Sequence, residues 1–249
     1  PAGRVNDFLR IATVFVFAVG AWIPPNEAYG QSAPVLHAYR GADDWARLPS
    51  GRNWGAPTGV EMDPDQESLW VLERCGDYNG PGCAESDLPA VMKFDASGRL
   101  LQSFGSGMFN YPHGLAVDYE GNVYVTDGRG EDGKGHQVFK FSPEGSVLMT
   151  LGEAGLAGGG VGRFNAPTDV VVAPNGDIFV ADGHTADGNN RIVKFSRDGR
   201  FIMSWGMTGS GPGEFLVPHA LAIDSQGRIF VGDRNNNRIQ IFDQHFRPV

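Results

Sequence analysis

The chain has 249 residues, of which 41% are hydrophobic, 36 are Gly and 16 are Pro. This composition excludes an intrinsically disordered chain, and it favours many short strands joined by tight turns over a helical bundle. The 29 acidic residues outnumber the 20 Lys and Arg, for a net charge of −9, and no basic run interrupts them. That balance excludes nucleic acid and an anionic membrane surface as partners.

Residues 1–30 differ from the rest of the chain. Two arginines precede an apolar run over residues 11–23, and small residues stand just before Gln31. This order predicts a signal peptide over residues 1–30 and an exported folded part, periplasmic or secreted. An uncleaved N-terminal anchor is the alternative, although the apolar run is shorter than the ~20 residues of a typical membrane span. Residues 31–53 are expected to be a lead-in segment.

From residue 54 onward the chain consists of four copies of one unit. Each copy is marked by a proline with an aromatic residue three positions before it, and the intervals between the prolines are 55, 55 and 51 residues. The prolines are Pro57, Pro112, Pro167 and Pro218. Each copy continues with short segments in which apolar and polar residues alternate, separated by turn residues. Four such strands per ~50 residues predict the blades of a β-propeller.

Three copies are complete and the fourth stops after its third strand. Residues 54–249 are therefore expected to form an incomplete all-β propeller of about three and a half blades, starting near residues 57, 112, 167 and 218. Units of this length favour six blades in the full protein, with the C-terminal part beyond Val249. A ring of four blades, with residues 31–50 lending the last strand, is the alternative.

The residue after each repeat proline alternates between two types. It is Thr58, His113, Thr168 and His219 in the four copies. In a six-bladed ring, a third His at this position of the sixth blade would complete a ring of three imidazoles. Three neutral imidazoles predict a zinc site with an open fourth position, which is typical of catalytic zinc. The alternative is that His113 and His219 are two structural histidines.

Several phrases carry a resemblance to known proteins. The segments PHGLAVDYEGNVYVTD and RIVKFSRDGRF resemble NHL repeats, and the order of phrases over residues 54–243 is similar to the peptidyl-α-hydroxyglycine α-amidating lyases. The resemblance implies a six-bladed propeller with zinc held by three His, of which His113 and His219 match two. It also implies a structural calcium bound partly by backbone carbonyls, at positions that match Val60 and Leu115.

The resemblance also implies roles for three other residues. Arg74 matches an arginine that holds the substrate carboxylate as a bidentate pair, although a surface arginine paired with Glu73 or Asp77 is the alternative. Arg234 matches a second arginine of the family's active site. His184 stands where the family has a tyrosine proposed as the base. An imidazole could take a proton near neutral pH, but the change equally fits another substrate or no lyase activity.

The two cysteines, Cys75 and Cys83, directly follow Arg74 and lie eight residues apart. In an exported protein they are expected to pair and close a small loop, which would contribute about 2–3 kcal/mol in the chain-entropy model. A metal site built on the two thiols is the alternative.

These features predict an exported zinc-dependent lyase that cleaves the C–N bond of a C-terminal α-hydroxyglycine, giving a peptide amide and glyoxylate. The expected partner is a peptide or a small substrate of the same type, and no pattern indicates an oligomer. The alternative is a non-catalytic NHL propeller that serves as a binding platform, with residues 128–136 and 183–190 as its polar rim. A calcium-dependent, lactonase-like hydrolase is a third reading.

Overall fold

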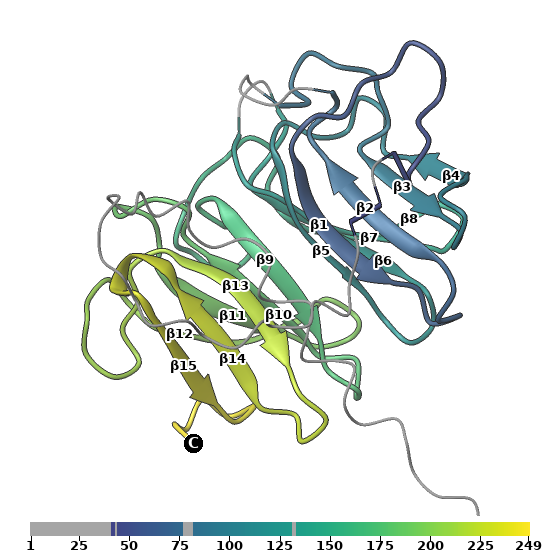
Figure 1. Ribbon diagram of the computed structural model, residues 1–249. Coiled ribbons are helices and arrows are strands. Elements are labelled where there is room, and N and C mark those ends of the chain that lie inside the picture. The colour runs from purple at the N-terminus through teal and green to yellow at the C-terminus, as the bar shows by residue number, and fades with distance from the viewer. Residues whose placement is uncertain (1–40, 43, 77–81, 131–132) are drawn as a thin grey trace, which may run out of the picture.

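The computed structural model describes residues 41–42, 44–76, 82–130 and 133–249 (Figure 1). The predicted signal peptide and most of the lead-in segment lie outside these residues. The elements are β1 (Pro57–Met62), β2 (Leu69–Glu73), β3 (Val91–Phe94), β4 (Leu100–Phe104), β5 (Pro112–Val117), β6 (Val123–Asp127), β7 (Gln137–Phe141), β8 (Val147–Gly152), β9 (Pro167–Val172), β10 (Ile178–Asp182), β11 (Arg191–Phe195), β12 (Phe201–Trp205), β13 (Pro218–Ile223), β14 (Ile229–Asp233), η2 (Arg234–Asn236) and β15 (Arg238–Phe242).

The strands form four antiparallel sheets in which each strand pairs with the next along the chain. Their orders are β1-β2-β3-β4, β5-β6-β7-β8, β9-β10-β11-β12 and β13-β14-β15. The first strands pack against one another in sequence, β1 on β5, β5 on β9 and β9 on β13 (Figure 1). This succession of sheets around their first strands confirms the predicted all-β propeller blades, three with four strands and one with three. The six-bladed ring stays a prediction.

The middle strands supply the cores between neighbouring sheets because successive side chains point to opposite faces of a strand. Val123 and Val125 of β6 pack into the core shared with the first sheet, whereas Tyr124 packs into the core shared with the third. In β10, Ile178 faces the second sheet and Phe179 the fourth. The period-two alternation of the sequence is thus the reason that one strand fills two cores.

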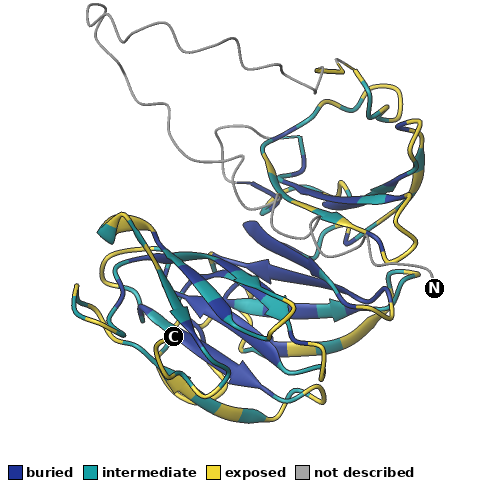
Figure 2. Ribbon diagram, turned by 60° about the horizontal axis from the view of Figure 1, so that its bottom comes forward, coloured by how far each residue is buried: buried dark blue, intermediate teal, exposed yellow. Residues whose placement is uncertain are grey.

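Burial decreases from the middle of each sheet outward. All five residues of β6 and of β10 are buried, whereas exposed and half-buried residues alternate along β4 and β12. Figure 2 shows the same gradient, with exposed residues on the loops and outer strands. The aromatic residues before the repeat prolines complete the cores between the sheets, where Phe109, Phe164 and Phe215 are at most 1% exposed.

A buried carboxylate ends the second strand of every sheet. Each of these four side chains is 0% exposed and accepts a backbone N–H from the turn before the repeat proline that opens its own sheet. The residue that follows the carboxylate donates its own N–H to the carbonyl just before that proline. The carboxylates belong to Glu73, Asp127, Asp182 and Asp233. The chain therefore turns in the same way after every second strand, at the end of the sheets where the first strands begin.

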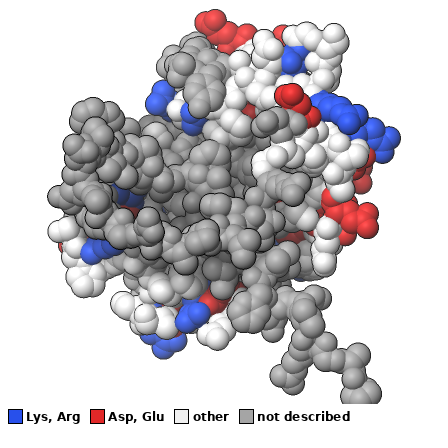
Figure 3. All heavy atoms as spheres, in the orientation of Figure 1, with Lys and Arg blue, Asp and Glu red and all other residues white. Residues whose placement is uncertain are grey.

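No helix of the described residues is long and apolar enough to cross a membrane. On the side of the molecule drawn in Figure 3, Lys and Arg side chains lie among Asp and Glu side chains rather than in one basic patch.

Candidate metal centre

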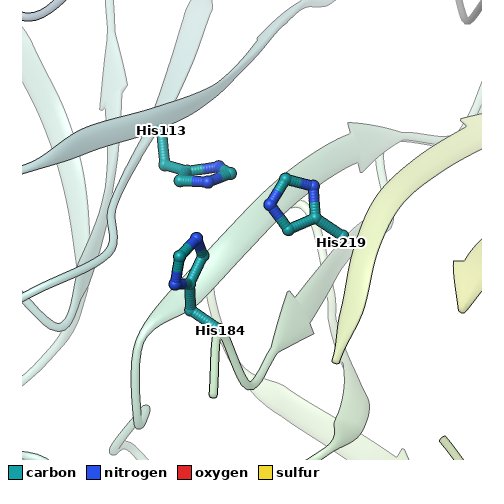
Figure 4. A group of neighbouring side chains, drawn as sticks. All are labelled: His113, His184 and His219. Carbon is teal, nitrogen blue, oxygen red and sulfur yellow. The ribbon is translucent and has the colours of Figure 1, made fainter. Parts of the chain in front are cut away.

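Three histidines from three sheets converge where the first strands begin. His113 lies on β5, His219 lies on β13, and His184 follows β10 (Figure 4). One ring nitrogen of each lies within 4.8 Å of the other two. The ring centroids are 4.7 Å apart for His113 and His219, 4.8 Å for His113 and His184, and 5.3 Å for His184 and His219. In the part of the chain that the structure describes, this is the one such group of His, Cys, Asp or Glu side chains.

His113 is oriented by a hydrogen bond to the next sheet. Its Nδ1 lies 2.7 Å from the carbonyl oxygen of Thr168 on β9. Because a carbonyl oxygen only accepts, Nδ1 must carry the proton, and Nε2 keeps its lone pair. A backbone carbonyl on the distal nitrogen is the usual partner of a metal-bound imidazole. The contact therefore prepares His113 to donate through Nε2.

His219 follows a strained segment of backbone. Val217, two residues earlier, has a φ of +61°, which is an outlier for a β-branched residue. Its N–H donates to the Oδ1 of Asn190 at 2.8 Å. Strained backbone of this kind persists only where the surroundings determine it, and it concentrates at functional sites. The position of His219 thus depends on Asn190.

Asn190 also organises the loop that carries His184. Its side chain is fully buried, and its Nδ2 donates to the carbonyls of Ala186 and Gly188 and to the hydroxyl of Thr208. The loop is thereby folded against the start of β11. A single buried amide accordingly holds the segments that carry His184 and His219.

His136 occupies the equivalent place before β7 and has a structural role. Its φ is +55°, close to the +48° of Asn190, and its Nδ1 accepts the N–H of Ala166 at 3.0 Å. Ala166 precedes a repeat proline as Val217 does, and it also has a positive φ. His136 therefore ties two sheets together and is separate from the three converging histidines.

The three converging histidines are neutral at pH 7. Burial lowers the pKa of His113 well below its usual value, and the neighbouring rings of His219 and His184 lower it further. Burial followed by the charge of Arg234 lowers the pKa of His184 to about 4 and that of His219 to about 3. Each ring therefore has a lone pair available to a metal ion.

Two arginines that the sequence interpretation named act on the three rings through their charge. Arg74, at the end of β2, is half-buried, and its Cζ lies 3.7 Å from the centroid of the Tyr111 ring. Arg234 opens η2 and donates from Nη2 to the carbonyl oxygen of His184 at 3.5 Å. The charge of Arg74 acts on the pKa of all three histidines and that of Arg234 on the pKa of two. The structure thus brings together the five side chains that the sequence interpretation named as ligands or catalytic residues.

Sequence reasoning missed Tyr111 and Arg129. The Arg129 Cζ lies 4.1 Å from the centroid of the Tyr111 ring. Arg129 stands two residues after the buried Asp127, as His184 stands two residues after Asp182. An alignment on the buried carboxylate rather than on the proline would have identified Arg129 as the counterpart of His184.

The predicted disulfide is present. Cys75 and Cys83 are joined, with their Cα atoms 5.2 Å apart, and both are buried in the core between the first two sheets. The N–H of Cys83 donates to the carbonyl oxygen of Asn110, just before Tyr111. The disulfide therefore links the end of β2, and with it Arg74, to the segment that leads into β5. This pairing contradicts the alternative of a metal site on the two thiols.

The two positions expected for calcium lie on neighbouring first strands. Val60 is on β1 and Leu115 is on β5. The two strands pack so closely that a Cβ added to Gly59 would come within 2.5 Å of the Cβ of Leu115. No group of three or more His, Cys, Asp or Glu side chains accompanies them within the described ranges. Calcium at this place stays a prediction.

The comparison with known families agrees with the repeat structure. The family model described as NHL repeat matches residues 109–141, 164–195 and 215–242. The chain carries NHL repeats. It is also 44% identical over 209 residues to peptidyl-glycine alpha-amidating monooxygenase B of Xenopus laevis, a match that covers 76% of this chain and 23% of the relative. It is 38% identical over 203 residues to peptidyl-alpha-hydroxyglycine alpha-amidating lyase 1 of Drosophila melanogaster, covering 77% of this chain and 34% of that one.

A third relative of this NHL-repeat chain has no activity in its name. NHL repeat-containing protein 3 of Mus musculus is 34% identical over 199 residues, covering 76% of this chain and 52% of the relative. Among solved structures, a streptogramin B lyase superposes with a TM-score of 0.56 at 18% identity, covering 79% of this chain and 54% of the other, and it bears on the fold alone. The chain spans about half or less of the length of these curated relatives.

The NHL-repeat chain supplies a donor set that fits zinc. Three nitrogens held tetrahedrally at 2.0–2.1 Å from one zinc ion lie about 3.4 Å apart, and the ring nitrogens of the three histidines lie within 4.8 Å of one another. Three neutral imidazoles leave the fourth position open. The sequence interpretation placed the third ligand beyond Val249 and assigned His184 as a base. In the structure the ring of His184 lies beside the other two rings, and a further ligand beyond Val249 stays a prediction.

Proposed function

We propose that this chain is part of an exported zinc-dependent carbon–nitrogen lyase that converts a peptide with a C-terminal α-hydroxyglycine into the peptide amide and glyoxylate. The observation that carries the proposal is the convergence of His113, His184 and His219 beside Arg74 and Arg234. The similarity to the amidating lyases supports the reaction and the peptide substrate. Export rests on the signal segment over residues 1–30.

In this proposal His113, His184 and His219 would hold the zinc. Zinc in such a site supplies a Lewis acid that lowers the pKa of a hydroxyl group beside it. Arg74 and Arg234 bind the substrate carboxylate and so fix the orientation of the α-carbon. The hydroxyl proton passes to water at the open rim, the O–H electron pair forms the aldehyde C=O, and the C–N bond breaks. The amide nitrogen takes up one proton, so protons and electrons balance.

His184 acts in this proposal as a ligand rather than as the base. Its ring lies about as close to His113 as the ring of His219 does, and burial and Arg234 lower its pKa to about 4. A base with so low a pKa is a poor proton acceptor near neutral pH, because efficiency is greatest when the pKa lies near the working pH. The same neutral ring is a good nitrogen donor.

The test is release of glyoxylate from a peptide that ends in α-hydroxyglycine, with the protein zinc-loaded and after removal of metal by a chelator. We expect release from the loaded protein and from the control His245→Ala, whose histidine is exposed on the last turn. Release should be lost in His113→Ala and in the stripped protein, and should return when zinc is added back to the latter. Release that persists without metal, or none from the loaded protein, would contradict the proposal.

A non-catalytic binding platform is the second candidate. It is supported by the similarity to NHL repeat-containing protein 3 and by His184 at the position where the resemblance implies a tyrosine. In that case the loaded protein would bind zinc and peptides but release no glyoxylate. The lactonase-like reading has less support, since the group of possible ligands within the described residues contains no carboxylate. A structural calcium on the carbonyls of Val60 and Leu115 remains part of the first proposal.

A further inference from the structure

Arg129 adds a guanidinium to the rim of the candidate metal centre. It follows Gly128, whose N–H donates to the carbonyl oxygen of Tyr111 at 2.9 Å, and its own guanidinium lies over the ring of that tyrosine. Arg129 is exposed, whereas Arg74 is half-buried. Two arginines that differ in solvent exposure therefore contact the same aromatic ring.

The Tyr111 ring lies between the two guanidinium groups. The Cζ atoms of Arg74 and Arg129 lie 3.7 Å and 4.1 Å from its centroid. At these distances both groups lie over the ring, and two planar groups of this size cannot share one face without overlap. They therefore stack on opposite faces, each favoured by the negative face of the aromatic ring.

The stack is built into the frame that carries the metal ligands. Tyr111 is 9% exposed, and its N–H donates to the buried carboxylate of Asp127 at 2.5 Å. It stands two residues before His113, and its ring centroid lies 6.3 Å from those of His113 and His184. A ligand held by the stack would thus lie beside the three imidazoles.

The positive charges at this rim exceed what one carboxylate would neutralise. Arg74, Arg129 and Arg234 all act on the pKa of His184. No ion pair between described residues includes Arg129 or Arg234. With Arg74 and Arg234 assigned to the terminal carboxylate, the guanidinium of Arg129 is the remaining cation. The guanidinium of Arg129 would attract a second anionic group of the same ligand.

We propose that Arg129 is a specificity residue that binds a second carboxylate, so that the preferred substrate carries an acidic side chain immediately before its C-terminal unit. The inference rests on the proposed function for the identity of that unit. The peptide leaves the centre past Tyr111, and its penultimate side chain meets the exposed guanidinium on the outer face of the ring. Recognition is by a bidentate carboxylate pair, which Asn at the same position cannot form.

The test is equilibrium binding of two unreactive peptides, ending in Asp-Gly and Asn-Gly, to the zinc-loaded full chain. We expect the Asp-Gly peptide to bind about fivefold more tightly, as for a well-oriented charge pair at an exposed site. Arg129→Gln should reduce this preference to near one. The control Arg200→Gln should keep it, because Arg200 is exposed on the turn between β11 and β12, at the opposite end of the sheet from Asp182. Equal binding of the two peptides by the wild-type chain, or a preference unchanged in Arg129→Gln, would overturn the inference.

The outcome can be separated from that of the proposed function. Glyoxylate release is measured in parallel with the matching Asp and Asn peptides that end in α-hydroxyglycine. A binding preference without release sustains the role of Arg129 and contradicts the lyase. Release with no preference between the two peptides sustains the lyase and contradicts the role of Arg129.

Discussion

The position after each repeat proline is held by threonine or histidine, and the two residue types differ in the hydrogen bonds that their side chains make. The hydroxyl of Thr168 donates to the carbonyl oxygen of Pro218 at 2.7 Å, and that of Thr58 lies 3.4 Å from the carbonyl oxygen of Pro112. These threonines link one first strand to the next. His113 makes the same kind of link through Nδ1 and has a second nitrogen left over. The alternation read from the sequence therefore separates structural residues from residues with a free lone pair.

The next position along the first strands is occupied by small residues except in the third sheet. It is Gly59, Gly114, Asp169 and Ala220 in the four sheets, and a Cβ on Gly114 would come within 2.7 Å of the Cα of Asp169. Asp169 instead accepts the N–H of Leu221 from the neighbouring strand at 2.7 Å. Burial raises the pKa of Asp169 to about 7.

The raised pKa of Asp169 makes stability depend on pH. Between the unfolded value near 3.9 and about 7, the folded state keeps a proton that the unfolded state loses, so the free energy of unfolding falls as pH rises through this window. In the metal-free chain we expect the wild type to lose about 1–3 kcal/mol more than Asp169→Asn between pH 5 and pH 8, measured by urea unfolding. Contributions from the histidines are common to both proteins and cancel in the difference. Parallel pH profiles for the two proteins would show that Asp169 is ionised in the fold.

At the scale of elements, the residues before the third strands of the second and third sheets, β7 and β11, connect neighbouring sheets. Asn190 and His136 both have a positive φ, and both accept the N–H of the residue that precedes a repeat proline. Asn190 differs because it also holds the loop that carries His184. It is therefore expected to act on the metal centre as a positioning residue.

Replacing Asn190 by Ala should weaken both the fold and the zinc site. The buried N–H of Val217 would lose its acceptor, which costs about 1–3 kcal/mol of the free energy of unfolding. His184 and His219 would lose a shared support, and we expect zinc affinity to fall about tenfold, as for other groups that orient metal ligands. Asn175→Ala, on an exposed turn where the side chain bonds only to Asp177, is the matched control and should leave zinc affinity unchanged. A loss of stability with unchanged zinc affinity would assign Asn190 to the fold alone.

For the whole molecule, repetition decided how much could be predicted. The strands, their sheets and the places of the repeat prolines follow from period-two alternation, which each sheet presents again. His113 and His219 were recognisable because the other two copies of the repeat have threonine at the same position. The convergence of His184 with His113 and His219 and the stack of Arg129 on Tyr111 were not predictable, because they depend on residues of the loops that follow β10 and β6. Loops carry no periodic constraint.

The central claim is that three imidazoles of this chain form one zinc site, and the coordination of zinc bound to the full chain tests it most directly. X-ray absorption at the zinc edge counts imidazole ligands from their scattering beyond the first shell. We predict three imidazole nitrogens at about 2.0–2.1 Å with one further light atom, and two imidazoles in His184→Ala. Two imidazoles in the wild-type protein, or a count that His184→Ala does not change, would contradict the account.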